Sequence, residues 1–237
     1  MFKTLISIIL WPVWYAFFIP SLMIILLLIY IVPYHKFYII VKPLCWLYCF
    51  FAGQWLVREG YPPPLDKQPY LYLFNHVSMF DQFMIGAFIS HHITAIGAVE
   101  IFKYPVFGSV LKKYGAIPIN RKILKNAIKS LGSVENAIKE GYSFIIAPEG
   151  TRTLSGEMSE FKKGPFHVAK NTNITIVPVA LIGGLNAKKK SDWRLCPGIL
   201  RTRFGKPINY IEYSHLSIED ISSLVKNRIQ NLIEAGA

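Results

Sequence analysis

One histidine and one aspartate stand at a spacing that could support acid–base chemistry. His76 follows a short apolar run, Tyr70 to Phe74, that predicts a strand, and Asp81 lies five residues further on in a stretch that predicts a helix. A turn between them would bring the carboxylate to one imidazole nitrogen and leave the other as a base. Such a base can take a proton from a hydroxyl nucleophile near neutral pH. Taken alone, the pair is better explained by a structural histidine and a helix-capping aspartate, so other segments must decide.

Two arginines also follow predicted strands. Arg121 ends a segment that begins at Gly115, and Arg152 ends a tight turn that begins at Pro148. If the strands run parallel, both arginines emerge at the same edge of the sheet as His76. Two guanidinium groups near exposed backbone amides suit a phosphate monoester. Either arginine alone would more readily form a surface ion pair, but three strand ends at one edge favour a site.

The segments that would position these residues alternate between strand and helix patterns. Short apolar runs predict strands at 70–74, 93–98, 116–119, 144–147, 174–180 and 200–204. Apolar residues repeating every three or four positions, and other helix-like stretches, predict helices at 79–88, 105–114, 124–138 and 218–232. This alternation predicts an α/β fold in which a mixed, largely parallel sheet is flanked by helices.

Residues 1–57 are far more apolar than the rest of the chain. No charged side chain occurs from Thr4 to Tyr34, and a helix of that length would measure about 46 Å against a hydrocarbon core of roughly 30 Å. Pro12 and Pro20 would kink such a helix. A second apolar run, Pro43 to Val57, is short for another crossing. We therefore predict a membrane-anchoring hairpin of two helices in one leaflet.

Residues 58–237 have the composition of a basic, soluble α/β domain. Only three of the 26 lysines and arginines precede Arg58, whereas all 14 acidic residues follow it. A basic surface beside a membrane suits anionic headgroups and phosphorylated substrates, and no nucleic-acid motif is present. The positive charges around the apolar segment predict the inner membrane, with the site facing the cytoplasm. A signal peptide over Met1 to Ala16 or one transmembrane helix is an alternative for the N-terminus.

Composition excludes several other classes. With 52% hydrophobic and 17% charged residues, the chain is not a disordered or nucleic-acid-binding tail. Three cysteines without a Cys-x-x-Cys spacing predict a reducing compartment and no metal site. The adjacent His91 and His92 would face apart, which also argues against a metal. The basic run 188–190 fits a solvated loop better than a contact with a headgroup or carrier protein.

Four blocks, in this order, resemble the glycerolipid acyltransferase superfamily. They are Asn75-His76 with Asp81, Gly115 through Arg121, Pro148 through Arg152, and Val177 through Val179. Within that superfamily the chain most resembles the bacterial 1-acylglycerol-3-phosphate acyltransferases. Its apolar N-terminus is similar to the two-helix membrane motif of that family.

The resemblance implies acyl transfer from acyl-CoA or acyl carrier protein to the free hydroxyl of a lysophospholipid, with no further cofactor. For 1-acylglycerol 3-phosphate the product would be phosphatidic acid. It implies His76 as the general base and Asp81 as its orienting partner, without an acyl-enzyme. It also implies that one set of residues binds the acceptor's phosphate and glycerol, namely Asn75, Arg121, Glu149, Gly150, Thr151 and Arg152. Val177 to Val179 would shape a wall of the acyl site.

The chain departs from the family pattern at two positions. Asn120 stands where the family usually has aspartate, and Ala98 where it often has lysine. The same chemistry could therefore act on glycerol 3-phosphate, lyso-ornithine lipid or another lysophospholipid. Ser78 beside the dyad would suit a thioesterase or hydrolase with an acyl-serine, but no Gly-x-Ser-x-Gly elbow surrounds it. A catalytically silent membrane-binding protein is a third alternative.

Overall fold

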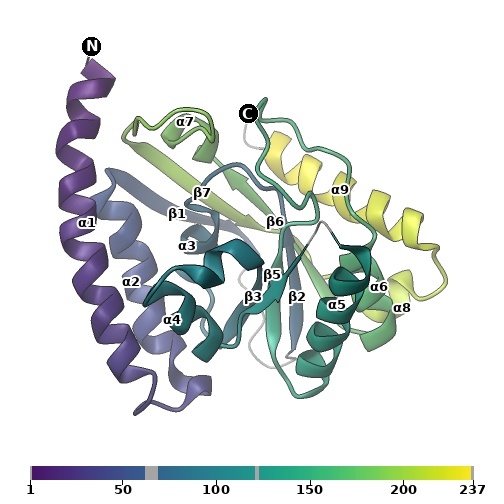
Figure 1. Cartoon of the computed structure of the whole chain (residues 1–237). Helices are drawn as coiled ribbons and strands as arrows, with labels where there is room; N and C mark the ends of the chain where they lie inside the picture. Colours follow the sequence, from purple (N-terminus) through teal and green to yellow (C-terminus); the bar gives the residue numbers. More distant parts are fainter. Residues whose placement is uncertain (1, 62–68, 121–122, 236–237) are drawn as a thin grey trace.

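The computed structural model describes residues 2–61, 69–120 and 123–235. Within these ranges the chain forms one seven-stranded sheet in the order β1-β7-β6-β2-β5-β3-β4 (Figure 1). The strands are β1 Gln54–Gly60, β2 Tyr70–Phe74, β3 Ile93–Ala98, β4 Ile117–Ile119, β5 Ser143–Ile146, β6 Thr175–Ile182 and β7 Gly198–Phe204. Among the described strands, β6 with β7 is the single antiparallel pair and the other neighbours run parallel. The predicted α/β fold with a mixed, largely parallel sheet is confirmed.

The central strand β2 is buried on both faces, as parallel strands covered by helices are. Its residues Tyr70, Tyr72 and Phe74 enter one core cluster, whereas Leu71 and Leu73 enter the other. This division follows the two-residue period of side chains along a strand. The carboxyl end of β2 is therefore held by packing from above and below the sheet.

Helices cover the two faces as two separate groups (Figure 1). One face carries α5 Leu124–Lys139, α6 Gly164–Thr172, α8 Tyr210–Tyr213 and α9 Ile218–Glu234. The other carries α1 Phe2–Leu28, α2 Tyr38–Phe51, α3 Asp81–Gly86 and α4 Phe107–Lys113, with the short helices η1 Tyr34–Lys36 and η2 Val99–Lys103. A further short helix, α7 Gly184–Ala187, follows β6 at the carboxyl edge of the sheet.

The second apolar run is part helix and part strand, which corrects the prediction of one helix over Pro43 to Val57. Helix α2 ends at Phe51, Gly53 turns the chain with a positive φ of +79°, and β1 begins at Gln54 and pairs with β7. An unbroken apolar run looks the same for a buried helix and a buried strand. The expected kinks do not end the first helix, because α1 continues through Pro12 and Pro20.

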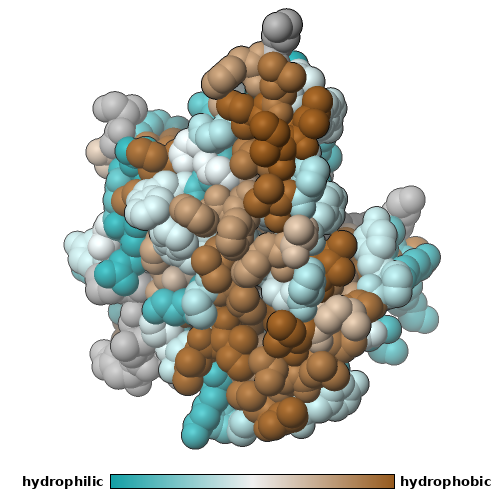
Figure 2. All heavy atoms as spheres, turned by 90° about the vertical axis from the view of Figure 1, so that its left-hand side faces the viewer, coloured by the Kyte–Doolittle hydropathy of each residue, from teal (hydrophilic) through white to brown (hydrophobic). Residues whose placement is uncertain are grey.

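The two N-terminal helices share a core with the sheet. Trp14 of α1 and Cys49 of α2 belong to the same buried cluster as Phe74 and Met84. The opposite side of α1 is exposed and apolar, and Figure 2 shows a hydrophobic surface on that side of the molecule. By length and composition α1 could cross a membrane, and only 17% of its most apolar 18-residue stretch is buried in the protein. This exposed apolar face indicates membrane association.

Candidate active site

The structure brings His76 and Asp81 together at the carboxyl end of β2. The strand ends at Phe74, a turn follows, and α3 begins at Asp81. The imidazole Nδ1 lies 2.6 Å from the Asp81 Oδ2 atom. The aspartate is fully buried, whereas the His76 side chain is 24% exposed. The turn therefore places a hydrogen-bonded His–Asp pair at the sheet edge with the imidazole open to solvent.

The turn itself supplies the hydrogen bonds that hold the Asp81 carboxylate. The Val77 amide donates to Oδ2 at 2.8 Å, and the Ser78 amide lies 3.0 Å from each oxygen. Burial raises the pKa of Asp81, while the bonds from His76 and the two amides lower it. Because the carboxylate accepts these bonds, we assign Nδ1 of His76 as the donor to Asp81, which leaves the Nε2 lone pair to accept a proton.

Glu149 fixes the backbone of the dyad. Its Oε1 accepts the His76 amide at 2.7 Å, and its Oε2 accepts the Ser159 amide at 2.9 Å and the Ser159 hydroxyl at 3.1 Å. The carboxylate is buried, and the adjacent Thr153 amide donates to the His76 carbonyl at 2.8 Å. Glu149, expected at the substrate, thus lies beneath the dyad as a positioning residue. Gly150 has a positive φ of +74°, which lets the chain turn there.

The Asn75 side chain forms hydrogen bonds with the protein backbone. Its side-chain nitrogen donates to the Leu181 carbonyl at 2.9 Å, and its side-chain oxygen accepts the Leu181 amide at 2.7 Å. The residue is buried, so this pair of bonds ties the end of β2 to β6. The sequence suggested substrate binding for Asn75, but its place in the structure is that of a positioning residue.

Two more of the predicted binding residues, Thr151 and Arg152, lie at the rim of the site. Thr151 is exposed, and its hydroxyl accepts a hydrogen bond of 2.9 Å from the Lys190 ammonium. Arg152, the next residue, is half-buried, and burial of Lys188 followed by the charge of Arg152 lowers the pKa of Lys188. Arg121 lies outside the described residues.

Lys188 and Lys190, which the sequence placed in a solvated loop, lie beside the dyad turn and Thr151. They follow α7, which packs so closely on the dyad turn that a Cβ at Gly184 would lie 2.9 Å from the Val77 side chain. The Ser78 hydroxyl donates to the Lys188 carbonyl at 3.2 Å. Because β6 runs parallel to β2, a basic run after β6 belongs at the edge that holds His76, and this relation was the available signal.

A model of the family described as Acyltransferase matches residues 56–182, more than half of the chain. The chain belongs to the acyltransferase family. It is 33% identical over 156 residues to a 1-acyl-sn-glycerol-3-phosphate acyltransferase of Cocos nucifera, a match that covers 65% of this chain and 51% of the relative. It is 28% identical over 180 residues to a probable 1-acyl-sn-glycerol-3-phosphate acyltransferase of Mycoplasma genitalium, covering 70% of this chain and 66% of the relative. The chain thus spans about half the length of the first of these relatives.

The fold of this chain is also that of a solved structure. The crystal structure of the 1-acyl-sn-glycerophosphate acyltransferase PlsC from Thermotoga maritima superposes with a TM-score of 0.87. The superposition covers 98% of this chain and 97% of the other at 20% sequence identity. The likeness includes the N-terminal helices as well as the sheet, since almost the whole chain is covered.

An apolar cavity of about 180 Å³ lies between the N-terminal helices and the sheet. Phe18 and Leu22 of α1 line it on one side, and Phe83, two residues after Asp81, lines it on the other. An alkyl chain fits such a lining. Val177 and Val179, expected at an acyl site, lie instead in the buried core and not among the lining residues that the structure describes.

Among the described residues, no group of three or more histidine, cysteine and acidic side chains could hold an ion. His91 and His92 are buried at the start of β3, at the opposite edge of the sheet from His76. The described site combines a hydrogen-bonded His76–Asp81 pair with a rim of cations.

Proposed function

We propose that the protein transfers an acyl group from a thioester, acyl-CoA or acyl carrier protein, to the free hydroxyl of 1-acylglycerol 3-phosphate, making phosphatidic acid. The observation that carries the proposal is the His76–Asp81 hydrogen bond of 2.6 Å beside exposed cations. Relatives named for this acceptor support the choice of substrate.

The geometry suits direct transfer without an acyl-enzyme. The acceptor hydroxyl gives its proton to Nε2 of His76 as its oxygen attacks the thioester carbonyl. Asp81 stabilises the imidazolium through its bond to Nδ1. The tetrahedral intermediate then collapses, the carbon–sulfur bond breaks, and the thiolate takes the proton from Nε2. Ser78 is fully buried and donates to the Lys188 carbonyl, so the dyad acts on the acceptor rather than on a serine nucleophile.

The exposed apolar face supports work at a membrane. We place the protein at the cytoplasmic face of the inner membrane, held in one leaflet by α1 and α2. The acyl chain of the lysophospholipid then enters from the lipid layer, while the donor's polar part arrives from water.

A thiol-release assay tests this function. The purified protein in detergent would receive palmitoyl-CoA with lysophosphatidic acid, glycerol 3-phosphate, lyso-ornithine lipid or no acceptor. We expect release that requires lysophosphatidic acid and is lost in His76→Ala, while His167→Ala, a change at an exposed histidine on α6, remains active. Release without an acceptor would instead indicate a thioesterase, and release with another acceptor only would replace the substrate.

A further inference from the structure

The segment after α7 forms a basic loop beside the dyad. We define residues 188–195 as the lysine loop. Lys188 is 9% exposed, and its ammonium donates to the Lys189 carbonyl at 2.9 Å. An ammonium has three N–H groups, so this bond leaves donors for a ligand. Lys190 reaches the Thr151 hydroxyl in the turn that also carries Arg152.

Asp192, the acidic residue of the lysine loop, is paired with cations other than Lys188 and Lys190 in its hydrogen bonds and ion pairs. The Asp192 carboxylate accepts two hydrogen bonds from the Arg194 side chain at 2.9 Å and lies 3.7 Å from the Lys3 ammonium. Its negative charge is therefore shared by two other cations. Burial of Lys188, and after it repulsion from the nearby Arg152, lower the pKa of the Lys188 ammonium, although Asp192 acts in the opposite direction. An anion bound there would relieve this repulsion.

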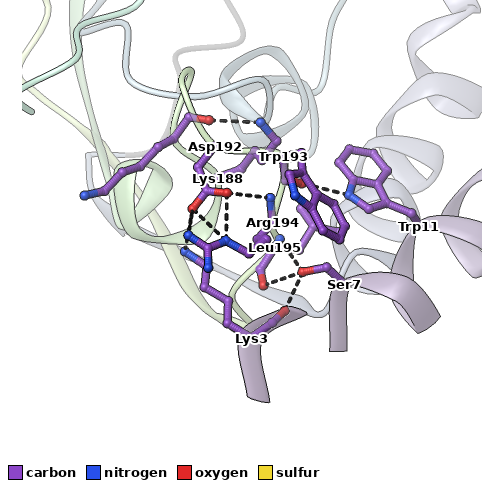
Figure 3. Close-up of polar contacts among 9 residues, drawn as sticks. Lys3, Ser7, Trp11, Lys188, Asp192, Trp193, Arg194 and Leu195 are labelled. Atoms are coloured by element: carbon purple, nitrogen blue, oxygen red, sulfur yellow. Dashed lines mark hydrogen bonds and ion pairs between the residues drawn. The ribbon is translucent and has the colours of Figure 1, made fainter. Parts of the chain in front are cut away.

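The lysine loop is held in place from two sides. On the inner side, the Ser78 hydroxyl of the dyad turn donates to the Lys188 carbonyl. On the outer side, the first turns of α1 contact the loop (Figure 3). The Leu195 amide donates to the Ser7 hydroxyl at 2.8 Å, and the Trp11 indole donates to the Trp193 carbonyl at 2.9 Å. A loop fixed at both ends can present cations at a defined place, unlike a solvated lysine run.

We propose that Lys188 and Lys190, together with Arg152, bind the phosphate monoester of the acyl acceptor and so select phosphorylated over neutral acceptors. The inference rests on the proposed function, because it names further residues for the same acceptor. The acceptor's phosphate is favoured over the phosphates of the donor for a geometric reason. Only a few bonds separate the phosphate of 1-acylglycerol 3-phosphate from the reacting hydroxyl, and the Lys188 carbonyl is bonded to the turn that holds His76. The phosphates of acyl-CoA lie a long pantetheine arm away from the thioester.

Three single variants of the full chain test this site: Lys188→Met, Lys190→Met and, as the matched control, Lys189→Met. Each keeps an unbranched apolar stem and removes one charge. The measurements are kcat and KM for lysophosphatidic acid and for monoacylglycerol, which lacks the phosphate. We expect the KM for lysophosphatidic acid to rise about tenfold or more in Lys188→Met and less in Lys190→Met, with little change in kcat. Lys189→Met should match the unsubstituted protein, and Lys188→Arg should recover most of the loss.

A binding experiment separates this role from turnover. In the His76→Ala background, calorimetry with glycerol 3-phosphate as the probe should show binding that is lost when Lys188→Met is added. Equal KM changes for both acceptors, an effect of Lys189→Met as large as that of Lys188→Met, or unchanged values in Lys188→Met and Lys190→Met would overturn the inference. The exposed Lys190 provides a second variant in case Lys188→Met does not fold. If the unsubstituted protein does not use lysophosphatidic acid, the proposed function fails first and the inference falls with it.

Discussion

The dyad turn and the lysine loop lie at the same edge of the sheet but are held in different ways. In the dyad turn, Asp81 is bonded to His76, Val77 and Ser78, all within five residues along the chain. In the lysine loop, the contacts come from 188 residues away at Ser7 and 110 residues away at Ser78. The local turn positions the reacting groups, whereas the loop depends on the assembled fold. The comparison predicts that changes in the turn lower kcat and that changes around the loop raise the KM for the acceptor.

The largest effect should follow from Asp81→Asn. The asparagine side chain can place an N–H group against Nδ1. Nδ1 would then accept a hydrogen bond, which favours the tautomer in which Nε2 carries the proton. By analogy with other His–Asp pairs, we expect kcat to fall by about a thousandfold to ten-thousandfold. The KM for lysophosphatidic acid should change little, because the lysine loop is intact. A rise in KM with kcat preserved would show that the turn and the loop do not divide the work in this way.

Lowering the pH should destabilise the protein, because His91 and His92 are buried at the opposite edge of the sheet from His76. Burial lowers the pKa of both His91 and His92 to about 4, from an ordinary value of 6.5. The unfolded chain therefore binds more protons as the pH falls from about 6.5 toward 4, and folding stability is lost across that window. The loss is roughly 3 kcal/mol or less for each histidine. Denaturant unfolding at pH 7 and pH 4.5 should show it, and a smaller pH effect in His91→Gln would assign it.

Glu149→Gln should weaken the dyad through its backbone. The buried Glu149 carboxylate accepts the amides of His76 and Ser159, and a glutamine would set an N–H group against one of these donors. We expect kcat to fall by about a hundredfold and the free energy of unfolding by about 1–3 kcal/mol. Kinetics and urea denaturation measure the two effects. The exposed Glu157→Gln, in the same loop, is the control and should leave both unchanged.

Ser7→Ala should loosen the lysine loop without touching the dyad. The variant removes the hydroxyl that accepts the Leu195 amide. We expect the KM for lysophosphatidic acid to rise a few-fold, less than in Lys188→Met, with kcat nearly unchanged. Ser133→Ala removes a hydroxyl that bonds its own helix, at the Lys129 carbonyl, and serves as the matched control. An unchanged KM in Ser7→Ala would mean that α1 does not position the loop.

A small effect is also expected for Ser78→Ala. Its hydroxyl bond to the Lys188 carbonyl is 3.2 Å long, and its backbone amide, which the variant keeps, is the group that holds Asp81. We expect kcat and KM to change by less than about tenfold, since one neutral hydrogen bond contributes about 1 kcal/mol. Loss of all turnover would favour a serine nucleophile and contradict direct transfer.

The same contrast explains what the sequence could predict. The five-residue spacing after a clear strand predicted contact between His76 and Asp81, although their role depended on the other blocks of the chain. The strands 70–74 and 93–98 were predicted at their observed bounds. β1 was missed because Pro43 to Val57 is apolar throughout and its helix–strand boundary depends on Gly53 and on pairing with β7. The lysine loop was predicted as solvated because nothing near Lys188 in the chain shows that Ser78 or α1 would hold it.

Product analysis is the most direct test of the central claim. Labelled lysophosphatidic acid and palmitoyl-CoA would be incubated with the unsubstituted protein, with His76→Gln and with Lys188→Met at saturating acceptor. We expect one phosphatidic acid formed per thiol released, almost none with His76→Gln, and near-normal amounts with Lys188→Met once its acceptor site is saturated. Thiol release without phosphatidic acid, or formation of phosphatidic acid by His76→Gln at the full rate, would contradict acyl transfer by this dyad.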